Sequence, residues 1–501
     1  MNELIRQLES AEGLNRNKIE LIKNNWAKQQ SIQAPLNSDI YNSMTAEQKI
    51  KFRDLLTTKP TRTLSGVSVV AIMTKPAGCV GRCTYCPTSS LAPKSYTGYE
   101  PSSMRARRNN FDSYLIVKNR LEQLKKVGHP TDKNEVIIQG GTFTWMPWDY
   151  QYNFVKRAYD AFNDIDASDL EQAKQINETA NHRVVALVIE TRPDWCKQEH
   201  IQKMLELGAT RCELGLQSVY DYVLDKIKRG HNLDEAKIAI RELKDAGFKV
   251  DLHMMLGLPG SSKELDIDMF RILFEDQDLR PDGLKIYPCG VIKGSELYNI
   301  WKAGDYEPIN DKYILEVLET IKPKYIPPYV RIKRLMRDIP SNHIEAGYKY
   351  LNIRQMLADG GVECRCIRCR EVGHKDVRRV SPELNVIEYD ASGGKEYFIS
   401  FDDKQSDSII GFARLRLPAD TKHAFIRELH VYGQAIPLGE SGEVQHKGLG
   451  KKLLAKAESI AKEAGRTEVL VLSGVGVKEY YRKLGYKSKG HYMKKNFISN
   501  N

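Results

Sequence analysis

The sequence predicts an α/β protein in which a barrel of parallel strands is fused to a separate, smaller α+β domain. Between about residues 65 and 290, short apolar runs alternate with helical stretches, and repeated strand–helix units form a parallel sheet, open or closed as a barrel. Beyond about residue 380, four strand-like runs precede an amphipathic helix and a further strand. The chain of 501 residues is also too long for one ordinary core.

These patterns divide the chain into four regions. We expect basic helices, the barrel, a Cys- and Arg-rich linker and the α+β domain at 1–64, 65–345, 346–380 and 381–501. The expected barrel strands are 65–74, 135–141, 183–191, 211–218, 249–260 and 283–288, with helices at 106–127, 197–207, 233–246 and 263–275. The last region should have strands at 384–390, 396–402, 408–417, 424–432 and 469–474, and helices from about 447 and near 477–484.

The composition is that of an ordinary globular protein, with 41% hydrophobic and 28% charged residues, which excludes collagen, coiled-coil and globally disordered classes. No apolar run approaches the roughly 18 residues of a membrane-spanning helix, and the N-terminus lacks the apolar core of a signal peptide. We therefore expect a cytoplasmic protein without membrane contact. A net charge of +11 favours a polyanionic partner, nucleic acid above all, with a merely solvated basic surface as the alternative.

Six of the nine cysteines fall in two tight clusters, which indicates metal binding rather than a disulfide framework. The first cluster, Cys79, Cys83 and Cys86, follows the first expected strand as CxxxCxxC. Three thiolates leave one iron of a [4Fe–4S] cluster open, and that iron can chelate S-adenosylmethionine for cleavage to a 5′-deoxyadenosyl radical. A zinc site lacking its fourth ligand is the alternative. The spacing resembles the radical S-adenosylmethionine (radical SAM) superfamily, whose fold is a partial TIM-type barrel.

Glycines and polar residues stand at the carboxyl ends of later expected strands, where barrels form their pockets. Gly140, Gly141 and Thr142 end the second strand, and glycine allows a ligand to approach the backbone. In radical SAM members this backbone faces the methionine amine. Glu190 ends the third strand and is a further expected cofactor contact. The remaining pocket candidates, each of which could instead be structural, are Arg192, Glu213, Gln217, His253 and Met255.

A glycine turn opens the amphipathic helix of the last region. In QHKGLGKKLL, Gln445, Gly448 and Gly450 form Q-x-x-G-x-G, and bare amides at a helix N-terminus bind pyrophosphate. Lys447 and Lys451 add positive charge. A dinucleotide-binding fold would use such a turn too, but the preceding strands resemble the GCN5-related N-acetyltransferase (GNAT) fold, whose turn binds the pyrophosphate of coenzyme A.

Two further segments agree with a GNAT fold. The strand Glu428-Leu429-His430-Val431 corresponds to the one whose backbone pairs with the pantetheine arm. Tyr480 and Tyr481 lie on a short helix where that fold places a residue near the thioester. We expect Tyr480 to cover the core and Tyr481 to act near the thioester.

The linker holds the second cysteine cluster, Cys364, Cys366 and Cys369, within ECRCIRCREVGH. Three thiolates at this spacing favour a structural zinc, which normally has four ligands. The candidates for the fourth are His374 and Cys289. A second iron–sulfur cluster is the alternative. A zinc here would fasten a segment that has too few apolar residues for its own core.

Several long strings together resemble the catalytic subunit of Elongator, a family that modifies the wobble uridine of transfer RNA (tRNA). They are PTRTLSGVSVVAIMTKP, SYTGYEPSSMRARR, IETRPDWC, LGLQSVYDYVLDKIKRGH, RPDGLKIYP, RELHVYG and SGVGVKEYYRKLGY. The resemblance implies that acetyl-coenzyme A docks on the GNAT domain with its acetyl group towards the barrel. The deoxyadenosyl radical would remove a hydrogen from the acetyl methyl, and the carbon radical would add to C5 of uridine 34. Hydrolysis of the thioester would leave 5-carboxymethyluridine.

The resemblance also implies roles for residues that match the family's motifs. Lys133 would contact acetyl-coenzyme A from the barrel side and, with Tyr481, is an expected catalytic residue. The acetyl-coenzyme A site would comprise Glu428, Leu429, His430, Val431, Lys447, Gly448, Leu449, Gly450, Lys451 and Tyr481. The tRNA surface would include the N-terminal region with Arg105, Arg107 and Arg108. A homodimer or a larger Elongator-like complex is expected. The chain departs from many relatives at Val80-Gly81 and Thr88-Ser89, beside the cysteine loop.

Two other functions remain open from the sequence. One is a protein lysine acetyltransferase that carries the barrel as a passenger, and it requires acetyl transfer to peptides without an iron–sulfur cluster. The other is a non-catalytic tRNA-binding scaffold whose metals are only structural, and it requires the absence of S-adenosylmethionine cleavage.

Overall fold

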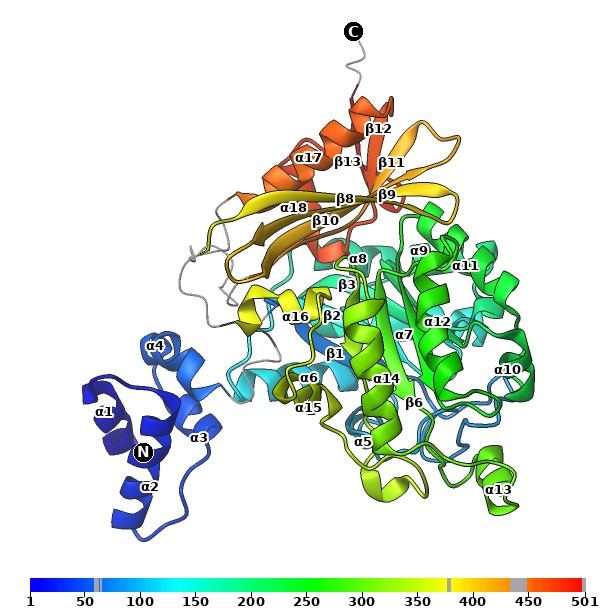
Figure 1. The fold of residues 1–501 in the computed structure, drawn as a ribbon. Helices are drawn as coiled ribbons and strands as arrows, with labels where there is room; N and C mark the ends of the chain where they lie inside the picture. Colours follow the sequence, from blue (N-terminus) through cyan, green and yellow to red (C-terminus); the bar gives the residue numbers. More distant parts are fainter. Residues whose placement is uncertain (58–62, 64, 376–379, 433–447, 498–501) are drawn as a thin grey trace.

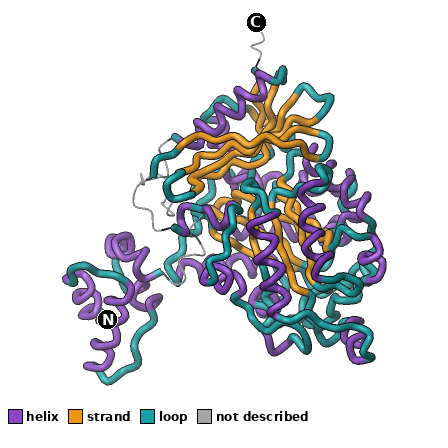
Figure 2. The backbone as a smooth tube through the Cα atoms, viewed as in Figure 1, coloured by secondary structure: helices purple, strands orange, loops and turns teal. Residues whose placement is uncertain are grey.

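The structure is a computed structural model that describes residues 1–57, 63, 65–375, 380–432 and 448–497. Three parts follow one another along the chain: a small helical unit, a parallel sheet with helices outside it, and a second sheet crossed by a long helix (Figure 1). The second sheet lies over one end of the first, and the helical unit stands to one side (Figure 2). Among the described helices, none has both the length and the apolarity to cross a membrane.

The N-terminal unit has its own small core, which includes Leu4, Ile19 and Phe52. Its helices are α1 (Asn2–Ser10), α2 (Arg16–Gln29), α3 (Asn37–Asn42) and α4 (Ala46–Leu56). Hydrogen bonds from Asn42 and Thr57 help to fasten it to the body. The Asn42 amide donates to the Lys126 carbonyl at 3.2 Å, and the Thr57 hydroxyl donates to the Gly128 carbonyl at 3.2 Å.

The first sheet is the predicted open half-barrel of parallel strands, which pair in chain order from first to last. The strands are β1 (Ser68–Met73), β2 (Lys133–Gln139), β3 (Arg183–Thr191), β4 (Arg211–Gln217), β5 (Lys249–Leu256), β6 (Gly283–Pro288) and β7 (Arg331–Arg334). β7 was not anticipated, because RIKR carries too little apolar character to signal a strand. Strands buried on both faces explain the near-continuous apolar runs in the sequence.

Helices connect these strands on the outside of the barrel (Figure 1): α5 (Pro101–Arg108), α6 (Ser113–Lys126), α7 (Trp148–Asn163), α8 (Leu170–Asn177), α9 (Gln198–Glu206), α10 (Asp221–Lys226), α11 (Leu233–Asp245), α12 (Lys263–Glu275), α13 (Glu296–Lys302) and α14 (Asp311–Lys324). The expectation of one helix over 106–127 is wrong. Asn110 and Phe111 have φ of 49° and 57°, left-handed values that end a helix. Asp112 then caps α6 by accepting the amide of Leu115 at 3.1 Å.

The linker adds three short elements against the barrel. They are α15 (Ile353–Asp359), α16 (Ile367–Arg370) and the 3₁₀ turn η5 (Val372–His374). The side chains of Ile353, Leu357 and Ile367 are fully buried in the barrel's core. The linker therefore packs its apolar side chains into the core of the barrel rather than into a core of its own.

The second sheet has the order β13-β14-β12-β11-β10-β9-β8. Its strands are β8 (Glu383–Ala391), β9 (Gly394–Asp403), β10 (Ser408–Pro418), β11 (His423–Val431), β12 (Glu468–Val471), β13 (Lys487–Lys489) and β14 (Tyr492–Asn496). The long helix α17 (Leu449–Glu463) covers one face, and η6 (Val475–Val477) and α18 (Lys478–Arg482) follow β12. On the other face Phe398 and Phe412 share the barrel's core.

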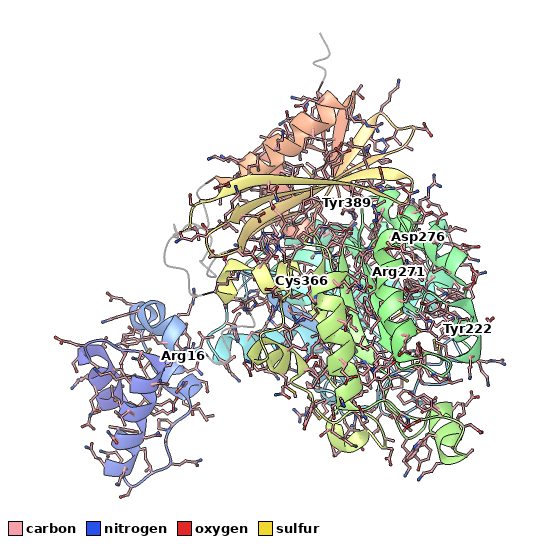
Figure 3. The ribbon with its side chains drawn as sticks, viewed as in Figure 1. Arg16, Tyr222, Arg271, Asp276, Cys366 and Tyr389 are labelled. Atoms are coloured by element: carbon pink, nitrogen blue, oxygen red, sulfur yellow. The ribbon has the colours of Figure 1, made fainter. Side chains whose placement is uncertain are left out.

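Buried charges fasten the second sheet to the barrel. Arg427 of β11 is fully buried and donates to both carboxylate oxygens of Asp282 at 2.6 and 2.8 Å, and to Glu396 at 2.7 Å. Beside it, Tyr329 and Tyr389 stack with ring centroids 4.0 Å apart, and Tyr389 lies where the two parts meet (Figure 3). Ion pairs this deeply buried fix the relative position of the two sheets.

Candidate functional site: a cysteine-lined pocket and an acetyltransferase turn

A cavity opens at the carboxyl ends of the barrel strands. It is open to solvent, and both polar and apolar side chains line it. The structure brings the expected strand-end residues together in its wall: Cys79, Cys83, Cys86, Gly140, Gly141, Glu190, Arg192, Glu213, Gln217, His253 and Met255. Thr142 lies just behind the wall, with its hydroxyl 3.3 Å from Cys79 Sγ.

The cysteine loop presents sulfur atoms to this cavity. Cys83 and Cys86 are buried, whereas Cys79 is partly exposed and accepts a hydrogen bond from the Gly81 amide at 3.4 Å. A hydrogen bond from Cys86 is the main cause that lowers the pKa of Cys83 to about 4; burial opposes the shift, and Arg229 and Arg192 add to it. The Cys83 sulfur therefore favours the thiolate, the form in which cysteine binds metals. The same hydrogen bond, together with burial and the charge of Cys83, raises the pKa of Cys86 well above its ordinary value.

Glycine at the end of β2 allows the cysteine loop to pack there. Gly140 has φ of 149°, and a Cβ on it would collide with the side chain of Thr74. A Cβ on Gly141 would stand 3.4 Å from the Cβ of Cys79. Gly140 thus makes room for Thr74 after β1, and Gly141 lies in contact with Cys79.

A buried lysine stands among the carboxylates on the pocket floor. Lys285 donates to Glu190 at 2.8 Å and pairs with Glu213, and His253 Nε2 lies 3.2 Å from Glu213. Glu190, Glu213 and His253 have ligand atoms within 4.8 Å of one another, as a metal site would. Burial opposes it, but the two carboxylates raise the pKa of Lys285 well above its ordinary value. An ammonium already balances this group, so we assign no metal to it.

Charged side chains continue through the barrel interior to the second sheet. Arg211 donates to Glu135 at 2.7 Å and lies 3.4 Å from Asp251. At the amino ends of the strands, Lys249 pairs with Glu428 of β11. This charged interior could not be predicted from the sequence, because alternate charged residues in a strand give no sign of whether they face water or one another.

The glycine turn begins α17 as expected. Gly448 has φ of 75° at the N-cap, a value that glycine adopts without strain. A Cβ on Gly450 would stand 3.7 Å from a methyl of Val431 and 2.9 Å from the Tyr480 hydroxyl. Lys451 is exposed and Leu449 is buried. Gln445 and Lys447 lie outside the described residues.

Strand β11 leaves an open backbone edge beside this turn. Its parallel pairing with β12 ends at Ile426, opposite Val471. From Glu428 to Val431 the described ladder continues only to β10. Such a split between neighbouring strands leaves backbone donors and acceptors free for an extended ligand.

The side chains along this edge alternate in direction. Leu429 and Val431 pack towards α17. His430 faces the barrel, where its ring nitrogen donates to the Ser65 carbonyl at 3.1 Å. Burial lowers the pKa of His430, so it is a neutral donor, and Glu428 likewise faces the barrel. An extended ligand would therefore meet the backbone of Glu428 and His430 rather than their side chains.

The two tyrosines of α18 differ from the expectation in their burial. Tyr481 is buried in the core beneath α17, where burial raises its pKa. Tyr480 has 36% of its surface exposed, and its hydroxyl lies beside Gly450 at the helix turn. Of the two hydroxyls, that of Tyr480 stands at the turn.

Lys133 begins β2, at the end of the barrel that the second sheet covers. It pairs in register with Arg183 of β3, and a Cβ on Gly476 of η6 would stand 3.1 Å from the Val184 amide nitrogen. Burial is the main cause that lowers the pKa of Lys133. Lys133 is therefore placed one strand away from the acetyltransferase-like domain, and at the end of the barrel opposite the cavity.

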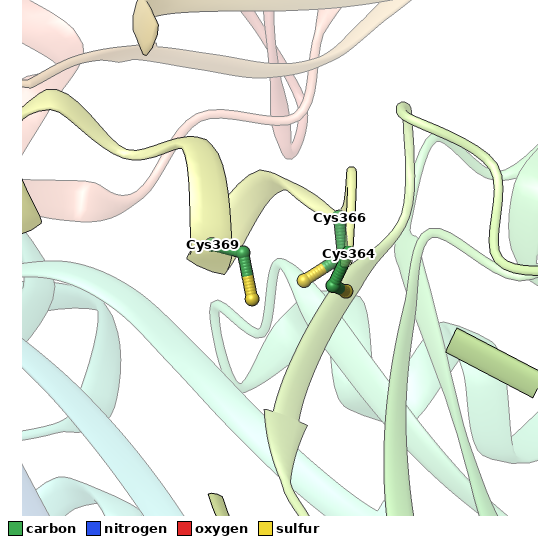
Figure 4. Close-up of side chains that lie close together, drawn as sticks. All are labelled: Cys364, Cys366 and Cys369. Atoms are coloured by element: carbon green, nitrogen blue, oxygen red, sulfur yellow. The ribbon is translucent and has the colours of Figure 1, made fainter. Parts of the chain in front are cut away.

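The linker cysteines form a compact group. The sulfur atoms of Cys364, Cys366 and Cys369 lie within 4.8 Å of one another, and Figure 4 shows the three side chains close together. His374 is not part of this group; its ring lies 3.9 Å from Glu371. Cys289 is buried with Cys83 and Cys86 instead. Within the described residues, neither proposed fourth ligand joins the three thiols.

Fold and sites together define the class: a radical SAM half-barrel followed by a GNAT domain. Family models agree, since the radical SAM superfamily matches residues 73–271, the radical SAM C-terminal domain residues 281–359, and the acetyltransferase (GNAT) family residues 368–486.

Relatives define the family more closely. The chain is 48% identical to the tRNA uridine(34) acetyltransferase of Methanocaldococcus jannaschii, covering 92% of this chain and 90% of that protein. It is 38% identical to human Elongator complex protein 3, covering 99% and 95%. The structure of Methanocaldococcus infernus Elp3 with an N-terminal deletion superposes with a TM-score of 0.76 at 45% identity, covering 87% of this chain and all of that one. The chain belongs to the family of the tRNA uridine(34) acetyltransferases and Elongator complex protein 3.

Some residues of the cavity wall could not be identified from the sequence. Arg229 and Lys285 both line the cavity, and each stands in a string that carried the family resemblance. A basic residue after a helix or within a strand gives no positional signal by itself. Only the tertiary structure shows that both side chains turn inward.

Proposed function

We propose that this protein modifies the wobble uridine of tRNA, forming 5-carboxymethyluridine from acetyl-coenzyme A. One observation carries the proposal: a thiolate-lined barrel pocket and an acetyltransferase turn belong to one chain and are fastened together by buried ion pairs. The names of the relatives supply the substrate, uridine 34 of tRNA. The product requires a carbon–carbon bond between the acetyl methyl carbon and C5 of the base. Neither the barrel nor the acetyltransferase domain alone is suited to forming that bond.

The residues present fit the cofactors of the two folds. Cys79, Cys83 and Cys86 would hold a [4Fe–4S] cluster, since three sulfurs line one cavity and Cys83 favours the thiolate. When bound, the cluster and S-adenosylmethionine supply a carbon-centred radical that can remove a hydrogen from a methyl group. The glycine turn and the open edge of β11 would take the pyrophosphate and the pantetheine arm of acetyl-coenzyme A.

The chain's own residues orient the reactants and hold charge. Lys285, Glu190 and Glu213 form a buried polar floor that can hydrogen-bond the groups of a bound nucleoside while excluding water. Tyr480 would contact the coenzyme at the glycine turn, while Tyr481 supports the helix from below. Lys133, whose charged form is weakened by burial, would meet acetyl-coenzyme A from the barrel side.

The two sites lie at opposite ends of the barrel. Glu190 is at the carboxyl end of β3 and Arg183 is at its amino end, about 23 Å apart at 3.3 Å per residue. The charged interior between them, from Glu213 through Arg211 and Asp251 to Lys249, is continuous. The acetyl unit of the coenzyme must therefore cross this distance to meet a radical formed at the cysteine-lined cavity.

Two further assignments belong to the proposal. Cys364, Cys366 and Cys369 would hold a zinc that fastens the linker, with the fourth ligand supplied by neither His374 nor Cys289. The tRNA would contact the N-terminal helical unit and α5, where Arg107 and Arg108 are exposed. The relatives named as Elongator complex protein favour action within a complex.

The test is nucleoside mass spectrometry of tRNA after reaction with the anaerobically reconstituted full chain, reductant, S-adenosylmethionine and acetyl-coenzyme A. We expect 5-carboxymethyluridine with the unaltered chain and none with Cys83→Ala. Product formation by Cys83→Ala would refute the radical route. Acetylated peptides without modified tRNA would instead indicate a protein acetyltransferase.

A further inference from the structure

Arg229 is a buried guanidinium aimed at the cysteine loop. It follows α10 and is 5% exposed. Its Nη1 donates to Cys83 Sγ at 3.3 Å, its Nε donates to the Gly215 carbonyl at 3.1 Å and to His231 Nε2 at 3.2 Å, and its Nη2 bonds the same carbonyl. Each of the three guanidinium nitrogens of Arg229 therefore has a hydrogen-bond partner.

Among the described residues, no carboxylate hydrogen-bonds or forms an ion pair with Arg229; its partners are Gly215, His231 and Cys83. Arg211, Arg414 and Arg427 are buried to a similar degree, and each pairs with Asp or Glu. The neighbour His231 supplies no negative charge either; burial, then the charge of Arg229, lowers its pKa to about 4, so it is neutral at pH 7. A buried cation without a carboxylate needs another anion, and among the described residues the Cys83 sulfur, to which it donates, can supply one.

A second guanidinium approaches the same sulfur. Arg192 Nη1 donates to Cys83 Sγ at 3.7 Å, while Nε and Nη2 hold Asp194 at 2.9 and 2.8 Å. Nη2 also donates to the Arg229 carbonyl at 2.6 Å. Because Asp194 neutralises Arg192, Arg229 is the stronger source of positive charge at Cys83.

Glycines make room for both side chains. A Cβ on Gly81 would collide with Arg192 Nη1, and a Cβ on Gly215 would meet Arg229 Nη2. The absence of a side chain at Gly81 therefore lets the Arg192 guanidinium lie against the cysteine loop.

We propose that Arg229, assisted by Arg192, is a positioning residue that raises the reduction potential of the iron–sulfur cluster through its hydrogen bond to Cys83. Hydrogen bonds and positive charge at a ligand sulfur stabilise the reduced, more negative cluster. Easier reduction would let a physiological one-electron donor prime S-adenosylmethionine cleavage. The proposal rests on the cluster assignment made under the proposed function.

The experiment is a redox titration, followed by electron paramagnetic resonance, of the anaerobically reconstituted full chain at matched iron content. We expect Arg229→Gln to lower the reduced-to-oxidised ratio at least tenfold at a fixed potential, which is a shift of about 59 mV for a one-electron couple. Arg229→Lys keeps the positive charge but lacks the planar guanidinium group. Its reduction potential should therefore lie between those of the unaltered chain and Arg229→Gln. Arg192→Gln should give a smaller shift, because its nitrogen is further from the sulfur and partly neutralised.

A matched control separates local from general effects. Arg334 lines the same cavity but bonds Asp338 instead of a cysteine, so Arg334→Gln should leave the potential near that of the unaltered chain. A purely structural role for Arg229 would reduce iron content or thermal stability without moving the potential, and would overturn the proposal.

The measurements of iron content and reduction potential also distinguish this proposal from the cluster assignment on which it rests. Failure of the unaltered chain to take up iron defeats the cluster assignment, whereas iron uptake with an unchanged potential in Arg229→Gln defeats only the role of Arg229. Where Arg229→Gln fails to fold, Arg192→Gln and Gly81→Ala take its place, the latter because its Cβ displaces the Arg192 guanidinium. An unchanged potential in both would refute the proposal.

Discussion

Arg427→Met removes the centre of the ionic joint between barrel and acetyltransferase domain. Arg427, Asp282 and Glu396 have no exposed side-chain surface, and the Arg427 fork makes bonds of 2.6 to 2.8 Å to both carboxylates and to the Phe248 carbonyl. Methionine fills much of the same space, so the loss is chiefly that of the cation.

We expect the loss of stability in Arg427→Met to lie near the lower end of the range for breaking a buried ion pair. Removing one partner of such a pair destabilises by about 3–5 kcal/mol. Asp282 keeps the Val250 amide at 2.8 Å and Arg414 at 3.4 Å, and Glu396 keeps Arg416 at 3.1 Å. We therefore expect about 3 kcal/mol, which corresponds to roughly a hundredfold in an opening equilibrium.

Hydrogen exchange of the Val250 amide measures this opening, because that amide is bonded to Asp282. Protection there should fall about a hundredfold in Arg427→Met. The control is Arg241→Met, at an arginine with 62% of its side chain exposed and 3.8 Å from Asp245, where we expect less than about 1 kcal/mol. Equal protection in the two variants would refute the argument that the joint is held by buried charge.

The same variant changes the acid stability. Burial opposes it, but Arg427 and Arg414 hold the pKa of Asp282 well below its usual range. A lowered pKa contributes stability that is complete above the unfolded value of about 4 and is lost as the pH falls through the folded pKa. Arg427→Met removes one cause of that shift, so the variant should lose less stability than the unaltered chain as the pH falls below about 4.

Three further predictions concern the linker, the coenzyme turn and the barrel. Cys366→Ser should lower bound zinc by about one ion per chain in elemental analysis, and an unchanged zinc content would exclude a metal at the linker. Tyr480→Phe should weaken acetyl-coenzyme A binding about 3- to 10-fold by calorimetry, whereas Tyr481→Phe should leave the Kd unchanged; the reverse order would place Tyr481 at the ligand. Burial raises the pKa of Asp266 to about 6, so the free energy of unfolding should fall by up to about 3 kcal/mol as the pH rises from about 4 to about 6. Asp266→Asn should abolish this pH dependence in denaturant titrations.

The fold was predictable because its signals are local. Apolar runs such as that of β1 and the alternation with helices predict a parallel sheet, and the Q-x-x-G-x-G turn predicts the start of α17. The break at Asn110 and the strand β7 were missed, because a left-handed turn without glycine and a charged edge strand carry no apolar pattern.

The candidate site was predictable only in part. Cys79, Cys83 and Cys86 were identified because spacing on one loop is itself the signal for a cluster. Tyr480 and Tyr481 are neighbours in sequence with the same chemistry, and only the packing of α18 decides which is exposed.

The sequence by itself determined the two chemistries of this protein, because thiolate spacing and a glycine turn are properties of short segments. The tertiary structure alone decided how they are joined. Arg229 meets Cys83 and Arg427 meets Asp282 across separations of 146 and 145 residues. A buried charge is stable only beside its partner, and a partner that far along the chain is chosen by the fold rather than by any local pattern.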